Sequence, residues 1–224
     1  MTVVTESRVG ASLLYVAMDL GSPPSMQWFG RQVDHVNTLW RHCLRLSVIV
    51  NEPQSSLREA LLNDSGFADP ESFPGQSYAG MPASDADRLR QIEQASPLLI
   101  SRTSLASPWV SVLTTVADKS APIAYGMAAL FAIQKLFDMV ITWQRHRFDM
   151  QQMRPTPLHS AEQVVMRHAS EELAAAQRSN AGSDPEPHDS VRFQGDTLAT
   201  IAVKGLAPVL EARMVDENDP LARG

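Results

Sequence analysis

The sequence predicts an α+β protein that is predominantly helical, with a small sheet of about three strands in its N-terminal half. Two observations lead to this fold class. Apolar residues recur at three- and four-residue steps over long segments, which is the period of a helix that buries one face. Shorter segments near residues 12, 46 and 98 are apolar or β-branched at successive positions, which favours buried strands. A long central helix and a helical C-terminal half complete the expected fold.

The first strand is expected at residues 12–19, because both of its alternating sets of side chains are apolar. A Gly-Ser-Pro-Pro breaker follows, and Ser25 is placed to cap a helix that begins near Met26. The spacing of the apolar residues then changes from a helical to an alternating pattern. Residues 46–50 are either a second strand, which would close a β-α-β unit, or a continuation of the helix to Asn51.

A second stripe of this helix is polar and partly basic. Charged stripes of this kind usually face water. The functional alternative is a site for an anion, an acidic partner or a small ligand, built on the helix over residues 26–45. The candidate residues of that site are Arg31, His35, His42 and Arg45.

Short elements are expected between this helix and residue 105. The pattern predicts a helix at residues 57–63, a second helix from residue 84 to about 94, and a strand at residues 98–104. Residues 64–84 are rich in proline and glycine, which predicts a loop.

The stretch after residue 106 contains the most apolar part of the chain. Ser107 and Pro108 predict the start of a short helix that reaches Asp118. A longer helix is expected from Ala121 to about Met150. It is apolar on nearly every face through residue 133 and becomes amphipathic beyond it.

Small residues at four-residue steps mark this long helix as an interaction surface, because they let another backbone approach closely. Such a helix exposes too much apolar surface to stand alone, so it needs cover from its own domain or from a partner. The predicted interaction residues are Ala124, Ala128, Ala132, Phe131 and Phe137.

Alternatively, a lipid bilayer could surround the apolar side chains of residues 108–143. The uninterrupted apolar run is about 14 residues long, whereas a membrane span needs roughly 20. Extending the span to Trp143 would place Lys135 and Asp138 in lipid, at roughly 2.5 to 3.5 kcal/mol for each charge. The pattern therefore favours a helix buried in protein over one inserted in a membrane.

Four regions are expected along the chain. They are a small α+β domain at residues 1–105, a helical region with the long central helix at 106–178, a flexible linker at 179–190, and a C-terminal helical segment at 191–224. A capping-box pattern opens a helix from residue 160 to about 178. Gly205 and Pro208 predict a kinked pair of short helices in the last segment.

Composition and motifs limit the chemistry. The net charge of −6 argues against a protein that coats nucleic acid. The single cysteine, Cys43, excludes an intrachain disulfide and fits a reducing compartment. The N-terminus lacks the pattern of a secretory signal, so a cytoplasmic location is expected, with membrane association as the alternative. Phosphate-loop, dinucleotide-binding and zinc-protease motifs are absent, so no catalytic residue, cofactor or metal is expected.

The leading functional hypothesis is a non-enzymatic helical interaction protein, acting as a subunit or accessory of a larger complex or as a homo-oligomer. Its partner would be a protein or a second copy of the chain. One alternative is a membrane-associated or membrane-inserting effector that uses residues 108–143. Another is a small-ligand binder or enzyme with its site on the helix over residues 26–45.

Overall fold

The computed structural model describes residues 13–21, 25–52, 54–63, 81–104, 108–115, 123–152, 198–216 and 219–220 of the 224-residue chain. The elements, in chain order, are β1 (Leu13–Met18), α1 (Met26–Asn51), α2 (Ser56–Leu62), α3 (Ala83–Ala95), β2 (Leu98–Ser104), β3 (Trp109–Thr115), α4 (Ile123–Gln152) and β4 (Val209–Val215). A further helix, named here the 198–205 helix, precedes β4. The predicted mixed α+β class is confirmed.

The four strands form one antiparallel sheet in the order β2-β3-β1-β4. Strand β3 therefore lies between β1 and β2, and β1 lies between β3 and β4. With α1 between β1 and β2 in sequence and α4 between β3 and β4, the connectivity is β-α-β-β-α-β. This is the ferredoxin-like, split β-α-β arrangement, and it carries two added helices, α2 and α3, after α1.

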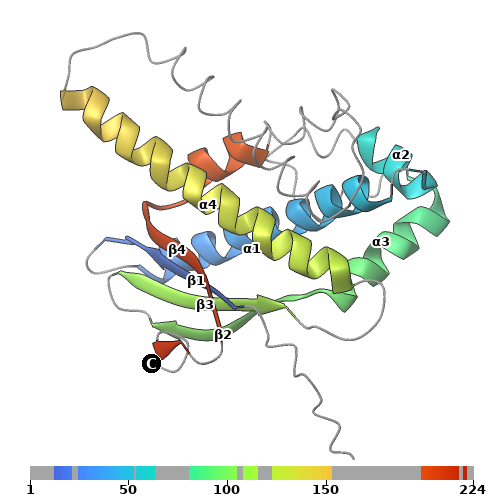
Figure 1. Ribbon diagram of the computed structural model, residues 1–224, viewed down its shortest axis with the longest axis horizontal. Helices are drawn as coiled ribbons and strands as arrows, with labels where there is room; N and C mark the ends of the chain where they lie inside the picture. Colours follow the sequence, from blue (N-terminus) through green and yellow to red (C-terminus); the bar gives the residue numbers. More distant parts are fainter. Residues whose placement is uncertain are drawn as a thin grey trace, which may run out of the picture.

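Figure 1 shows α1 and α4 side by side on the same face of the sheet. The main core lies between these two helices and the sheet, and the 198–205 helix also contributes Leu198, Ile201 and Ala202 to it. Strand β1 is buried at all six positions, as predicted for a strand covered on two faces. Leu14, Val16 and Met18 face the main core, while Leu13, Tyr15 and Ala17 belong to a separate apolar cluster with Val112 and Val215.

Helix α1 begins where the sequence predicts. The Ser25 side chain accepts a hydrogen bond from the Trp28 amide at 3.1 Å. The helix then continues to Asn51, so the alternative of a strand and a β-α-β unit at residues 46–50 is wrong. Two different clusters surround this part of α1, Leu46 in the main core and Val48 and Ile49 against α2 and α3, and a helix can serve both because its faces point in different directions.

Strand β3 corrects the prediction of a short helix after Pro108. Residues 109–115 alternate between the faces of the sheet, with Trp109 and Leu113 in the main core and Val112 in the opposite cluster. Valine and threonine, which are frequent in this segment, favour the extended backbone. The helical start signal of Ser-Pro is local, whereas pairing with β1 and β2 involves most of the strand.

Strand β4 corrects the prediction of a helix after Pro208. It pairs with β1 along its length, from Val209 opposite Met18 to Val215 opposite Leu13. The sheet therefore has four strands instead of about three, and one of them comes from the C-terminal region that was expected to be helical throughout. Only the first of the two predicted C-terminal helices is present, as the 198–205 helix.

Helices α2, α3 and the central helix α4 agree with the sequence pattern in type and approximate position, and so does strand β2. Leu57, Leu61, Leu89 and Ile92 close a small second core where α2 and α3 meet the end of α1. The predicted helix at 160–178, the linker at 179–190 and most of the loop at 64–84 lie outside the described residues. The predicted domain limits stay predictions, although regions before residue 105 and after residue 191 share the main core.

Candidate functional site

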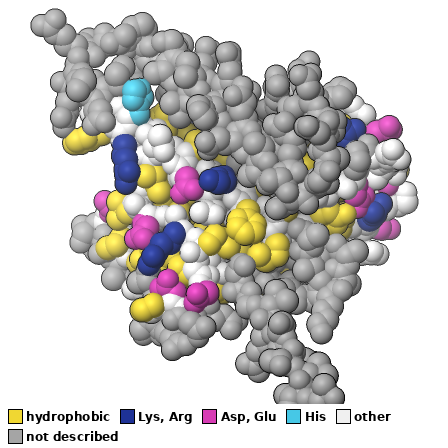
Figure 2. Space-filling view, viewed as in Figure 1, with side chains coloured by type: hydrophobic (Ala, Val, Ile, Leu, Met, Phe, Trp, Pro, Cys, Tyr) yellow, Lys and Arg dark blue, Asp and Glu magenta, His cyan; other side chains and the backbone are white. Residues whose placement is uncertain are grey.

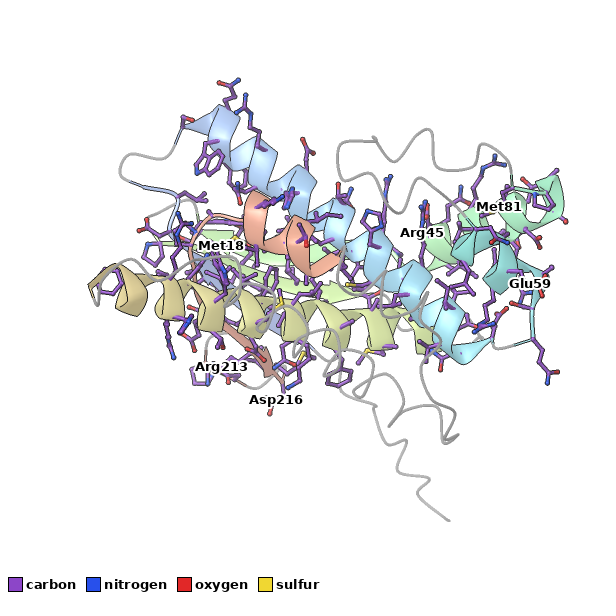
Figure 3. All side chains as sticks on the ribbon, turned by 90° about the horizontal axis from the view of Figure 1, so that it is seen from above. Met18, Arg45, Glu59, Met81, Arg213 and Asp216 are labelled. Atoms are coloured by element: carbon purple, nitrogen blue, oxygen red, sulfur yellow. The ribbon has the colours of Figure 1, made fainter. Side chains whose placement is uncertain are left out.

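The predicted polar stripe of α1 is mostly internal. Arg31 is exposed, His35 is half-buried, and His42 and Arg45 are buried. Figure 3, seen from above, shows the reason: the 198–205 helix lies between α1 and α4, and α3 approaches α1 near the labelled Arg45. Three of the four predicted anion-site residues therefore lie against other elements of the same chain.

His35 connects α1 to the 198–205 helix. Its Nε2 lies 3.0 Å from the carbonyl oxygen of Ile201, and because a carbonyl can only accept, this nitrogen carries a proton and donates. The imidazole also occupies the place of the missing side chain of Gly205. Burial lowers the pKa of His35, while the hydrogen bond to Ile201 acts in the opposite direction.

Gln32 makes the second connection to the C-terminal segment. Its Nε2 donates to the carbonyl of Gly205 at 3.2 Å, and its Oε1 accepts from the amide of Ala207 at 2.8 Å. One buried amide side chain thus satisfies two backbone groups at the end of the 198–205 helix. No local sequence signal marks Gln32, because its partners lie more than 170 residues further along the chain.

His42 and Arg45 lie deeper along α1. The Nε and one terminal nitrogen of Arg45 donate to Oε1 of Glu93 on α3, at 3.2 and 3.1 Å. Burial lowers the pKa of His42 to about 4, with smaller contributions from the charges of Arg45 and His35. A neutral imidazole and an engaged guanidinium are poor anion ligands, so the geometry gives little support to an anion site here.

A polar network joins α1, α3 and α4 at the other end of α1. Oε1 of Glu52 accepts from the hydroxyl of Tyr125 and from Arg88, the latter at 2.7 Å. Burial, followed by the hydrogen bond to Glu52, raises the pKa of Tyr125 to about 12. A phenol that holds its proton this firmly serves as a hydrogen-bond donor between helices rather than as a base at neutral pH.

The predicted interaction residues of α4 are divided between core and surface. Ala128, Ala132 and Phe137 are buried within the chain, while Phe131 is 40% exposed. The side chain of Ala124 lies outside the described ones. The cover for the two described alanines therefore comes from the chain itself.

No residue set for metal or nucleophilic chemistry emerges in the part of the chain that the structure describes. It contains no group of three or more potential metal ligands among histidine, cysteine, aspartate and glutamate. Cys43 is fully buried, and burial raises the pKa of its thiol, so it is not a nucleophile in the folded state.

Two surface regions carry exposed apolar side chains. In the edge strand β2, Leu99 is 41% and Ile100 is 44% exposed, and the four strand residues that follow them are polar and exposed. At the C-terminal end of α4, Phe148 is exposed beside basic side chains. Figure 2 shows histidine and basic side chains over this end of α4, at upper left.

Over Tyr125–Phe148, α4 is long and apolar enough to cross a membrane, and 61% of an apolar 18-residue stretch within this segment is buried inside the protein. The core helix of a soluble protein has the same properties. No protein-family model, curated protein or solved structure matches the chain. The split β-α-β fold supports many activities, so the fold by itself does not define a function.

Proposed function

We propose that the protein is a non-enzymatic assembly protein whose copies join through the outer edge of strand β2, at its apolar residues Leu98, Leu99 and Ile100. The observation that carries this proposal is the exposure of Leu99 and Ile100 on an outermost strand. Among the described strands only β3 pairs with β2, so its other edge offers a row of backbone donors and acceptors. Edges of this kind accept a further strand, which brings backbone hydrogen bonds and side-chain contacts together.

If two copies of β2 pair in the antiparallel direction, the apolar residues of one copy lie opposite the apolar residues of the other. Leu98 and Ile100 lie on the face of β3 residues Thr115 and Leu113, while Leu99 lies on the opposite face, with Thr114. A two-fold axis at Leu99 places Leu99 opposite Leu99 of the second copy and Leu98 opposite its Ile100. Every directly opposed pair is then apolar and on the correct face, which is the self-complementarity that a two-fold interface needs.

A bulge limits the length of this edge. The register of β2 against β3 shifts between Ile100 and Arg102, and bulges bend an edge strand away from further pairing. The part of β2 before the bulge is the apolar one, and the interface is therefore small. We expect a weak dimer, with a dissociation constant in the micromolar range, because small interfaces are typical of transient complexes.

The edge of β2 replaces α4 as the proposed contact surface. The apolar faces of α4 predicted a contact surface because they need cover, and α1, the sheet and the 198–205 helix supply that cover. The membrane-spanning alternative has the apolar segment at Tyr125–Phe148 in its favour. It requires α4 to leave this core and to lose the hydrogen bond from the Val209 amide to Gln144.

The test is the mass of the full chain by light scattering after gel filtration, over about 1 to 200 micromolar. We expect the average mass to rise toward that of a dimer, and the variant Leu99→Lys with Ile100→Lys to remain a monomer throughout. The matched control is Leu210→Lys in β4, an exposed leucine on the opposite edge, which should dimerise normally. A wild-type chain that stays monomeric, or a dimer that survives the double substitution, would contradict the proposal.

A further inference from the structure

The C-terminal end of α4 extends beyond the body of the protein. Figures 1 and 3 show this end of α4 reaching past α1 and the sheet. Arg145, His146, Arg147 and Phe148 are all exposed, and Phe148 is 62% exposed. Consecutive helical residues point about 100° apart, so four exposed residues in a row mean that the helix is open on all sides here. By contrast, residues 128–143 keep one side buried.

This end reverses the sign of the protein's charge. The whole chain carries −6, whereas the α4 residues 143–152 contain Arg145 and Arg147 against the single acid Asp149. None of the ion pairs among the described residues involves Arg145, His146 or Arg147. The Arg147 guanidinium lies 5.2 Å from the centre of the Trp143 ring, so this cation already rests on an aromatic face.

We propose that this projecting end of α4 docks on an anionic lipid surface. Arginines that contact phosphate groups, beside a phenylalanine that enters the headgroup region, are the combination typical of peripheral membrane contacts. The shape also fits, because a convex helix end needs a deep pocket on a protein partner but no pocket on a deformable lipid surface. Nucleic acid is a poorer match, since few cations are available and the rest of the chain is acidic.

The docking is peripheral and does not require α4 to span the membrane. The apolar residues of α4 stay between α1 and the sheet, and only the turn that begins at Arg145 touches lipid. The surface lies on α4 and not on β2, so this inference is independent of the proposed dimer. A dimer would nevertheless present two such ends and strengthen the binding.

The test is sedimentation of the full chain with vesicles of phosphatidylcholine alone or with 30% phosphatidylserine. We expect binding only to the anionic vesicles, and loss of that binding as salt rises toward 0.5 M, because screening weakens contacts between exposed charges. Arg145→Glu and Arg147→Glu should each lower the partition coefficient about tenfold, since removing one basic contact costs about fivefold and the new charge is repelled. Phe148→Ser should lower the partition coefficient at every salt concentration at which the wild-type chain still binds.

The matched control is Arg90→Glu, which makes the same charge change on the exposed side of α3 and should keep binding within about twofold. Circular dichroism checks that all variants are folded. Equal binding to both kinds of vesicle, no binding to either, or an equal loss in Arg90→Glu would overturn the proposal. Binding that resists high salt and alkaline carbonate would indicate insertion of α4 instead. Capture of an acidic polypeptide without binding to vesicles would assign this end of α4 to a protein partner.

Discussion

The imidazole of His35 fills the space beside Gly205 that a side chain would occupy. A Cβ built on Gly205 would lie 1.8 Å from Cε1 and 1.9 Å from Nε2 of His35, far inside van der Waals contact. The same Nε2 donates to Ile201, one turn earlier in the 198–205 helix. The absence of a side chain at Gly205 therefore allows α1 and this helix to approach closely enough for the hydrogen bond.

Gly205→Ala should lower the free energy of unfolding by about 2 kcal/mol, because the ring or the 198–205 helix must move and overpacking of this kind typically costs 1 to 3 kcal/mol. Urea denaturation measures the change. In a His35→Ala background the same substitution should cost far less, since the opposing ring is gone. Gly30→Ala is the control: nothing lies within 4 Å of its Cβ, and alanine should stabilise α1 by about 0.5 to 1 kcal/mol. Equal effects at the two glycines would refute the close contact.

Acid should destabilise the protein through His42. Its folded pKa of about 4 lies below the ordinary 6.5, so between these values the unfolded chain binds more protons than the folded one. The contribution of His42 to the free energy of unfolding is therefore complete above pH 6.5. It is lost as the pH falls toward 4, which lowers the free energy of unfolding by about 3 kcal/mol. His35, whose pKa is also lowered, adds to the loss in the same direction.

Urea denaturation at pH 7.5, 6, 5 and 4.5 measures this dependence. His42→Gln, which cannot titrate, should flatten the curve between pH 6.5 and 4.5. His146→Gln, the same substitution at an exposed position of α4, is the matched control. An identical slope in wild type and His42→Gln would show that another group controls the acid sensitivity.

The spacing of apolar residues was sufficient to predict the elements whose buried faces are determined by their own sequence. Helices α1 and α4 carry apolar positions at helical spacing, and β1 is apolar on both faces, so their types follow from the sequence. Strands β3 and β4 depend on distant pairing. Leu14 of β1 contacts Leu113 on one side and Met214 on the other, and no local pattern contains these partners.

The prediction of the candidate site is limited in the same way, because it too depends on partners that lie far away in the sequence. Residue types along α1 predicted a polar stripe, and His35, His42 and Arg45 do share a side of the helix. That this side is internal depends on the 198–205 helix and on Glu93 of α3, which approach from elsewhere in the chain. The exposed edge of β2 could not be predicted either, because an edge is defined by the order of strands in the sheet.

The ion pair between Arg45 and Glu93 should contribute far more to the free energy of unfolding than the exposed ion pairs do. Their side chains are 3% and 15% exposed, so Glu93→Ala leaves a guanidinium with reduced compensation in the interior. We expect a loss of about 3 kcal/mol in the free energy of unfolding. Arg45→Met combined with Glu93→Met should recover most of it, because neither charge then remains buried. Asp87→Ala, which removes the exposed partner of Arg90, should cost about 0.5 kcal/mol or less.

Cys43 offers a direct measure of how often the main core opens. Its thiol is fully buried on α1, and burial raises its pKa, so neither access nor thiolate is available in the folded state. Ellman's reagent should therefore release less than a tenth of an equivalent in minutes at pH 8, and one full equivalent in guanidinium chloride. Because Cys43 is the only cysteine, the signal has a single source, and Cys43→Ser should abolish it.

The Cys43 thiol of the Gly205→Ala variant should react faster than that of the wild type if the C-terminal segment stabilises the core around α1. Rapid stoichiometric reaction of the native wild-type chain would contradict the burial of α1 described above.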